Sequence, residues 1–377
     1  MSALGLYIHW PYCTAICPYC DFNVYRARGA AAEPLIRAIE SDLAAHAARF
    51  GSRVAQSVFF GGGTPSLLRG DEVARILDAA SRAFTLAADC EITLEANPEN
   101  ASFFAEQAAA GINRFSVGVQ ALDDDALKAL GRKHDAKTAL RAIDAAAATH
   151  QRVSADLIYA REGQSDAAWR EELTRALALP VEHLSLYELT IEPRTAFARR
   201  AERGQLNPPD DETAAQLYET TQALCEAAGF QGYEISNYAR APEARARHNL
   251  IYWRSDDWIG VGPGAHGRIT HSGVRTATES QLRPADYIDA VRENGVGWIR
   301  DVQLTDEQAA DEMILMGLRT VEGVNIDEVA ERRKRPINRD ALDWLEGAGL
   351  IVVEGARVRL APSGRLLANK ISAELAI

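Results

Sequence analysis

Short β-type runs alternate with longer helical runs through the first half of the chain, and this alternation limits the fold more than any other feature. Runs typical of strands occur at residues 6–10, 57–60, 91–96, 114–119, 153–159 and 183–189. Alanine-rich stretches typical of helices occur at residues 33–49, 71–84, 136–149 and 166–179. Repeated strand–helix units build a parallel sheet covered by helices. The sequence therefore predicts an α/β fold, a partial (β/α)6 barrel of the TIM type.

Three cysteines, Cys13, Cys17 and Cys20, follow the first predicted strand with the spacing CxxxCxxC. In such a barrel the reactive groups gather at the C-terminal ends of the strands, which is where these cysteines would lie. Three thiolates are one fewer than a closed zinc site or a fully ligated cubane cluster requires. A cubane held by three thiolates keeps one iron open to a small molecule, so the spacing indicates chemistry at a cluster.

A structural zinc site or a disulfide framework fits these cysteines less well. Zinc would need a second CxxC pair or two histidines, but the remaining cysteines, Cys90 and Cys225, are isolated. A disulfide framework would need an oxidising compartment, and the start of the chain lacks the pattern of a secretion signal. We therefore expect a cytoplasmic protein in which Cys90 and Cys225 are small buried hydrophobic residues.

Composition excludes some functions. The chain has 377 residues and is 47% hydrophobic, enough for one large core and a smaller second one. No apolar run is long enough to span a bilayer, so any membrane contact would be peripheral. The formal net charge of -12 repels a phosphate backbone, so we expect no nucleic-acid partner. The basic run at residues 332–335 fits a solvated helix end, with an RNA or anionic-lipid patch as the alternative.

The remaining predicted strand ends also carry informative residues. The second strand is followed by Gly61-Gly62-Gly63-Thr64-Pro65, where missing side chains would let a ligand approach backbone N–H groups, although a tight turn explains the glycines equally well. Polar side chains occur at the next three strand ends: Glu95, Gln120 and Asp156. A ligand with amine, carboxylate and ribose groups would use such a set.

Together, the CxxxCxxC spacing, the GGGTP loop and Glu95 resemble the radical S-adenosylmethionine proteins of the coproporphyrinogen-oxidase-like family. The resemblance implies that Cys13, Cys17 and Cys20 hold a 4Fe-4S cluster whose open iron is chelated by S-adenosylmethionine. It places around this nucleotide Tyr7, Gly62 and Glu95. It implies a second nucleotide position at Gly63, Thr64, Gln120, Arg132 and Asp156.

Two departures favour one branch of that family. The porphyrinogen-decarboxylating oxidases carry a fourth cysteine two places after the third, where this chain has Phe22. They also have an extension before the first strand, whereas the cluster motif here begins at Cys13. Both differences resemble the HemW-type branch, regarded as haem chaperones that deliver haem to haem-requiring respiratory proteins. The alternatives are an oxygen-independent coproporphyrinogen III oxidase and an unrelated radical enzyme that modifies RNA or a metabolite.

The segment HNLIYW at residues 248–253 matches the HNxxYW signature of HemW-like proteins and disfavours the last alternative. A neutral imidazole is a good ligand of haem iron, and aromatic rings offer flat faces to a porphyrin. The haem candidates are therefore His248, Tyr252 and Trp253. A hydrogen-bonded packing role for His248 is the alternative, and His266 in a glycine-rich turn is the competing ligand. His9 is expected to tune the cluster through hydrogen bonds.

The resemblance covers nearly the whole chain. One departure is Ala160-Arg161-Glu162-Gly163 after the fifth strand, where relatives usually read Gly-Leu-Pro. Helical runs at residues 305–318, 326–333 and 338–347 precede a hairpin at residues 350–360 that turns at Glu354-Gly355, which predicts a small winged-helix-like α+β domain. We divide the chain into a barrel (1–240), a connecting region (241–300) and this domain (301–377). The sequence leaves open the number of bound nucleotides, catalysis by the cluster, the haem acceptor and a homodimer.

Overall fold

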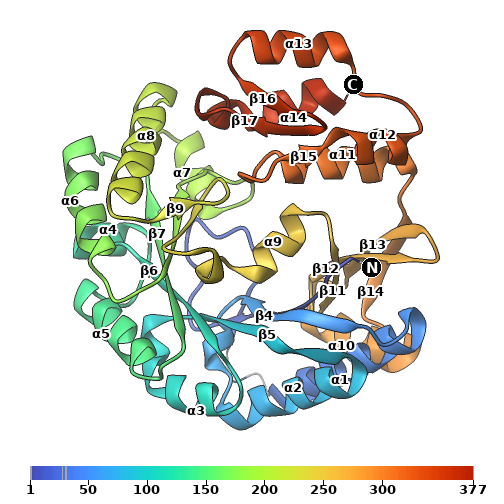
Figure 1. Ribbon diagram of the computed structural model, residues 1–377. Helices are drawn as coiled ribbons and strands as arrows, with labels where there is room; N and C mark the ends of the chain where they lie inside the picture. The colour runs from blue at the N-terminus through green and yellow to red at the C-terminus, as the bar shows by residue number, and fades with distance from the viewer. Residues whose placement is uncertain (1, 28, 30–31, 377) are drawn as a thin grey trace.

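The barrel forms around a curved, mainly parallel sheet (Figure 1). A computed structural model describes residues 2–27, 29 and 32–376 of the chain. The first strands are β1 (Leu4–Trp10), β4 (Val54–Gly62), β5 (Thr85–Ala96), β6 (Arg114–Gln120), β7 (Arg152–Tyr159) and β8 (His183–Glu188). They lie side by side in this order and run parallel. The predicted α/β fold and its strand–helix alternation are confirmed.

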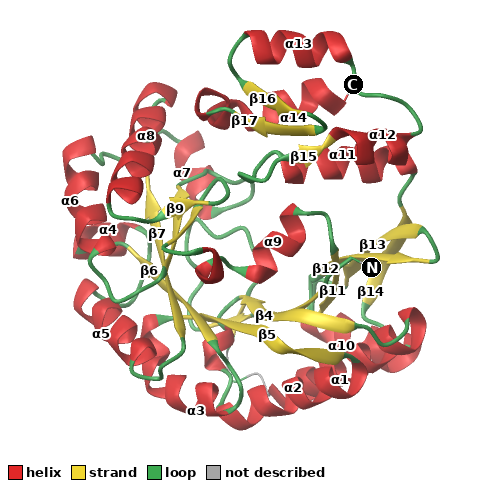
Figure 2. Ribbon diagram, in the orientation of Figure 1, coloured by secondary structure: helices red, strands yellow, loops and turns green. Residues whose placement is uncertain are grey.

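Helices cover the convex side of the sheet, as Figure 2 shows. They are α1 (Ala32–Phe50), α2 (Gly70–Ala83), α3 (Phe104–Ala109), α4 (Asp124–Ala129), α5 (Ala136–Ala147), α6 (Asp166–Leu177) and α8 (Asp211–Ala227). Helix α7 (Ala196–Glu202) lies instead against the cysteine-bearing segment, where the N–H of Phe197 donates to the carbonyl of Pro18 at 2.9 Å. Several of the helices begin at a side chain that accepts a backbone N–H from the first turn, as Asp135 does for Thr138 and Ser165 for Ala168. Such caps satisfy amides that have no partner within the helix.

The two faces of the sheet differ in chemistry. Side chains alternate between the faces of a strand. On β1, Leu6 and Ile8 are fully buried in the main hydrophobic core, together with Leu35 and Ile39 of α1. The alternate residues of the strands face the inside of the barrel. On β4 to β8 most of these inward-facing residues are polar: Ser57, Glu91, Glu95, Arg114, Ser116, Ser154, Asp156 and His183. The helices therefore pack on an apolar surface, while the barrel interior carries a hydrogen-bonded network.

The segment 241–300 extends the same sheet. β11 (Asp257–Val261) pairs in parallel with β1, and β12 (His266–His271), β13 (Val274–Ser280) and β14 (Trp298–Gln303) continue antiparallel. The opposite edge is formed by β10 (Asn237–Ala239) and β9 (Gln231–Gly232). Two helices complete the segment, α9 (Arg247–Trp253) and α10 (Pro284–Asn294). These strands were not predicted, and the division at residues 240 and 300 stays a prediction.

The C-terminal domain has its own hydrophobic core. Its elements are α11 (Asp306–Gly317), β15 (Val324–Asn325), α12 (Ile326–Arg333), α13 (Arg339–Gly347), β16 (Ile351–Glu354), β17 (Arg357–Leu360) and α14 (Ala368–Ala376). The predicted hairpin is confirmed, because Glu354 pairs with Arg357 across a turn in which Gly355 has a φ of +62°. A third strand, β15, and the last helix were not predicted. Ile314, Leu342 and Val358 meet in the core between helices and sheet.

The two parts of the chain are joined by contacts as well as by the backbone. Arg254 after α9 donates to Glu322 at 2.8 Å, and Glu234 forms an isolated β-bridge with Thr320. Helices α9 and α11 lie against each other (Figure 1). Among the helices within the described residues, none combines the length and apolar character needed to cross a membrane.

Candidate iron–sulfur and nucleotide site

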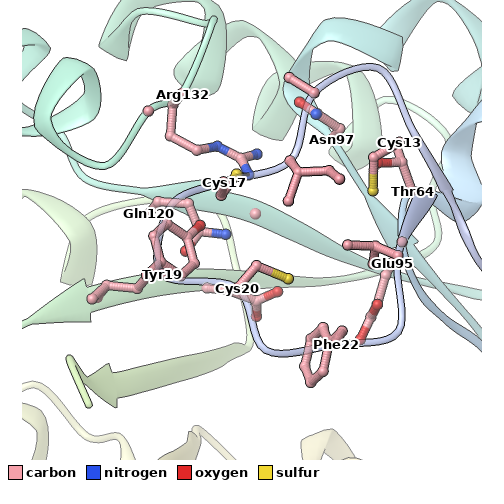
Figure 3. Close-up of a pocket in the computed structure, with 18 of the residues that line it drawn as sticks. Cys13, Cys17, Tyr19, Cys20, Phe22, Thr64, Glu95, Asn97, Gln120 and Arg132 are labelled. Carbon is pink, nitrogen blue, oxygen red and sulfur yellow. Dashed lines mark hydrogen bonds between the residues drawn. The ribbon is translucent and has the colours of Figure 1, made fainter. Parts of the chain in front are cut away.

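The three predicted cluster cysteines lie on one loop that is closed at its base. Strands β2 (Tyr12–Cys13) and β3 (Tyr25–Arg26) pair in parallel and hold the two ends of the loop together. Within it, the N–H of Cys20 donates to the carbonyl of Cys17 at 3.2 Å, which forms a tight turn around Pro18. All three cysteines line one cavity of about 370 Å³ (Figure 3). The strand-end rule therefore places the loop correctly, at the C-terminal end of β1.

Asn23 fastens this loop to the sheet extension. Its side-chain amide donates to the carbonyls of Pro263 at 2.9 Å and Leu282 at 2.8 Å. A Cβ on Gly264 would lie 2.5 Å from the Asn23 amide nitrogen, so the turn between β11 and β12 needs glycine at this point. The glycine-rich segment 260–267 thus supports the cysteine loop by close backbone approach.

The donor set suits a cluster better than a single metal ion. Within the described residues, no group of three His, Cys, Asp or Glu side chains is arranged to hold one ion. In a cubane each thiolate binds a different iron, so the thiols need to surround a volume and need not converge on one point. Burial, together with the neighbouring thiols of Cys17 and Cys13, raises the pKa of Cys20 to about 12. Iron would supply the positive charge that these buried sulfurs need as thiolates.

The glycine loop and Glu95 meet beside the cysteines. The N–H of Gly62 donates to Glu95 Oε2 at 3.0 Å. Gly62 has a φ of +103°, a conformation that residues with a Cβ rarely adopt. Burial, followed by the neighbouring carboxyl of Asp156, raises the pKa of Glu95 to about 8. A ligand that brings a positive charge would favour the ionised form of this carboxyl.

Asp156 is held by hydroxyl groups. Ser116 Oγ donates to its two carboxylate oxygens at 2.9 and 2.8 Å, and Ser154 Oγ lies 3.3 Å from one of them. Burial raises the pKa of Asp156, while these hydrogen bonds and one from Ser185 lower it. These hydroxyl groups hold the carboxyl of Asp156 in the wall of the cavity.

Arg132 brings a cation to the cysteine loop. Its Nη1 lies 3.3 Å from Cys17 Sγ, and Figure 3 shows the two side chains together above Gln120. Gln120 has a φ of +66° at the end of β6. A guanidinium is a permanent cation, so Arg132 can pair with a thiolate or with a ligand carboxylate.

Most of the predicted nucleotide residues reach the same cavity, namely Gly62, Gly63, Thr64, Glu95, Gln120, Arg132 and Asp156. Tyr7 does not line it but lies beneath, with its hydroxyl 2.9 Å from His9 Nδ1. Sequence reasoning did not single out further lining residues, including Ile16, Tyr19, Asn97, Tyr187 and Glu188. Tyr187 and Glu188 end β8, so the strand-end rule could have found them. The functional roles of all these residues stay predictions.

The structure places the haem candidates elsewhere. His248 is 1% exposed, with Nδ1 2.7 Å from Ser57 Oγ and Nε2 2.7 Å from the Tyr252 hydroxyl. Neither ring nitrogen is free to ligate iron in this conformation, which matches the packing alternative. Trp253 faces the C-terminal domain, where the Arg319 guanidinium lies 6.0 Å from its ring. His266, by contrast, is exposed at the start of β12.

Comparison with known proteins gives consistent results along the chain. Residues 7–176 match the radical SAM superfamily, and residues 304–367 match the HemN C-terminal domain. The chain is 34% identical to the heme chaperone HemW of Bacillus subtilis (strain 168), over 97% of this chain and 97% of that protein. It is 41% identical to radical S-adenosyl methionine domain-containing protein 1, mitochondrial, of Bos taurus, over 85% of this chain and 74% of that protein.

Among solved structures, the chain is similar to coproporphyrinogen III oxidase (HemN) from Escherichia coli, described as a radical SAM enzyme. The TM-score is 0.82 at 22% sequence identity, and the match covers 100% of this chain and 90% of that chain. At this identity the likeness shows a shared fold, which includes the small C-terminal domain.

The cysteine loop predicts which thiols bind iron. Replacing any one of Cys13, Cys17 and Cys20 by Ser should remove most of the iron and sulfide that the full chain takes up on anaerobic reconstitution, because each thiolate would bind a different iron. Cys90→Ala and Cys225→Ala are matched controls, since both thiols are free, buried and outside the cavity, and they should retain wild-type iron. Full iron content in a triple Cys→Ser variant would contradict the assignment.

The position of Glu95 in the cavity predicts that its carboxyl contributes to the binding of S-adenosylmethionine. Glu95→Ala should weaken binding roughly 10- to 100-fold, the effect of removing a hydrogen bond to a charged group. Iron uptake should not change, because Glu95 is not a cysteine-loop residue. Calorimetry on cluster-loaded protein measures the affinity, with exposed Asp125→Ala as the control. Equal affinities of wild type and Glu95→Ala would show that this carboxyl does not contact the nucleotide.

The raised pKa of Glu95 also predicts a pH-dependent stability. In the unfolded chain a glutamate titrates near about 4.3, whereas burial raises the pKa of Glu95 to about 8 in the folded protein. Its contribution is therefore full below the unfolded value and is lost as pH rises through about 8. Between pH ~5 and ~8.5, the melting temperature of the protein without ligand should fall more steeply for wild type than for Glu95→Gln. Parallel curves in circular dichroism melts would refute the raised pKa.

Proposed function

This chain belongs to the HemW-like branch of the radical S-adenosylmethionine superfamily, and we propose that it binds haem and delivers it to haem-requiring respiratory proteins. It does so as the carrier of a 4Fe-4S cluster and S-adenosylmethionine. The observation that supports this most is the match to a heme chaperone HemW over 97% of both chains, which includes the cysteine loop and the C-terminal domain.

The cavity supplies groups suited to the proposed cofactors. When bound, the reduced cluster supplies the electron that cleaves the sulfonium of S-adenosylmethionine. Cys13, Cys17 and Cys20 would hold this cluster at the end of β1. Glu95 would accept from the ligand amine or ribose, and the backbone around Gly62 would lie close to the nucleotide. Arg132 would neutralise a carboxylate of the ligand or a cysteine thiolate.

Position 22 supports a chaperone in preference to a porphyrinogen oxidase. Phe22 lines the cavity and is 59% exposed, at the place where the oxidases carry their additional cysteine. A phenyl ring can neither donate a proton nor bind a metal ion as a thiol can, so the chain lacks the thiol that the oxidases have at this position. An exposed aromatic ring at a cavity mouth instead offers an apolar contact surface.

The two candidate ligands of haem iron differ in accessibility. His266 is the more accessible, because its imidazole is exposed, whereas that of His248 is enclosed in the barrel. A peripheral membrane contact and a cytoplasmic location stay predictions from the sequence, which leaves the identity of the acceptor protein and a homodimer open. A net charge of -12 supports the absence of a nucleic-acid partner.

The proposal predicts haem transfer without porphyrinogen conversion. Full-length protein with a reconstituted cluster should bind haem, seen as a stable Soret band, and pass it to an apo-haemoprotein. With S-adenosylmethionine and a reductant under anaerobic conditions, it should not convert coproporphyrinogen III to protoporphyrinogen IX. The product is measured by chromatography after oxidation to the porphyrin. Multiple-turnover decarboxylation would overturn the chaperone and establish the oxidase.

A further inference from the structure

Helix α9, which carries the HNLIYW segment, lies inside the curved sheet near the N-terminal ends of the strands (Figure 1). A Cβ at Gly5 of β1 would lie 3.1 Å from His248 Cε1, so the imidazole packs closely against the backbone of this strand. The backbone N–H groups of Arg247 and His248 donate to the buried Glu91 carboxylate at 2.8 and 3.2 Å. The start of the helix is therefore fixed within the barrel.

The imidazole of His248 is hydrogen-bonded on both sides. It joins the hydroxyls of Ser57 and Tyr252, each at 2.7 Å. Burial lowers the pKa of His248 to about 3, so the ring is neutral, with one nitrogen donating and the other accepting. Binding of iron would break one of these bonds and would leave a buried hydroxyl without its partner.

The same imidazole supports the layer directly beneath the nucleotide cavity. His248 stacks on Phe59 with ring centroids 5.0 Å apart, and Tyr7 stacks over both rings at 6.3 and 6.2 Å. Tyr7 then bonds His9, whose Nε2 lies 2.9 Å from the carbonyl of Asn23 in the cysteine loop. A continuous set of contacts thus runs from α9 to the cluster loop.

The glycine loop rests on this layer. A Cβ on Gly61 would lie 2.8 Å from Phe59 and 2.9 Å from Tyr7, and a Cβ on Gly62 would lie 2.4 Å from His9. The position of the loop that donates to Glu95 is therefore set by the rings below it. A shift of those rings would displace the loop, because packed interiors transmit small movements.

We propose that His248 and Tyr252 are positioning residues of the nucleotide site, acting through Phe59, Tyr7 and His9, and that they do not ligate haem iron. This inference rests on the proposed function, because it presumes that the cavity binds S-adenosylmethionine. It assigns the HNLIYW segment to the support of the cluster and nucleotide, and it leaves haem to groups outside the barrel interior.

Tyr252→Phe tests the proposal with the smallest change, since it removes only the hydroxyl that bonds His248. His248→Phe removes both hydrogen bonds and keeps an aromatic ring, whereas His248→Gln can restore the bond to Tyr252. In full-length, cluster-loaded protein, Tyr252→Phe should bind S-adenosylmethionine about 5- to 10-fold more weakly than wild type, on the order of one lost buried hydrogen bond, and His248→Phe, which loses two, should bind at least as weakly. His248→Gln should recover part of the affinity, which a role in packing alone does not predict.

Two controls complete the experiment. Arg254 directly follows the same helix, and its side chain contacts Glu322 of the C-terminal domain. Arg254→Gln should therefore leave the affinity for S-adenosylmethionine unchanged. Iron content and melting temperature identify any variant that fails to fold, in which case Tyr252→Phe decides. The haem Soret band should stay the same in the His248 and Tyr252 variants.

The outcomes separate the two proposals. If wild type does not bind S-adenosylmethionine, the proposed function fails. If wild type binds and the His248 and Tyr252 variants bind equally well, the positioning role is wrong. A changed Soret band in the His248 variant with unchanged nucleotide affinity would assign this histidine to haem and overturn the inference.

Discussion

The carboxylate of Glu91, buried inside the barrel, ties together elements that are far apart in the sequence. Its Oε1 accepts the first N–H groups of α9, and its Oε2 pairs with Arg152 at 3.0 Å and Arg114 at 3.5 Å. A buried charge is costly unless it is paired and hydrogen-bonded, and this carboxylate has partners from β6, β7 and α9. Because α9 carries His248, the position of the aromatic rings below the cavity depends on the Glu91 carboxylate.

Strand β5 therefore carries two glutamates with different roles, one near each end of the barrel. Glu91 and Glu95 lie four residues apart on the inner face of β5, so one anchors α9 while the other reaches the cavity. The surrounding network differs accordingly: Glu91 meets two guanidinium groups, whereas Glu95 has Gly62 N–H and a neighbouring carboxyl. Glu91 is therefore already paired with cations of the chain, whereas the ionised form of Glu95 would be favoured by a ligand that brings a positive charge.

The sequence predicted the parts of this architecture that depend on local pattern. Apolar residues facing the helices marked the parallel strands, and the strand-end rule placed Cys13, Glu95 and Asp156 around one cavity. Strand β11 was missed because its main partner, β1, lies some 250 residues earlier, and a pairing so distant leaves no local signal. The position of His248 was equally hidden, since its bond to Ser57 spans 191 residues and follows only from the strand register.

Binding of S-adenosylmethionine in the cavity requires that one iron of a three-cysteine cluster be open to this ligand. Electron paramagnetic resonance of the reduced, reconstituted full-length protein tests this most directly, with spectra recorded before and after addition of S-adenosylmethionine. Direct ligation of the open iron by the nucleotide should change the g values of the cluster signal. Identical spectra at saturating nucleotide would contradict this arrangement, because the cluster would then have no coordination position within reach of the ligand.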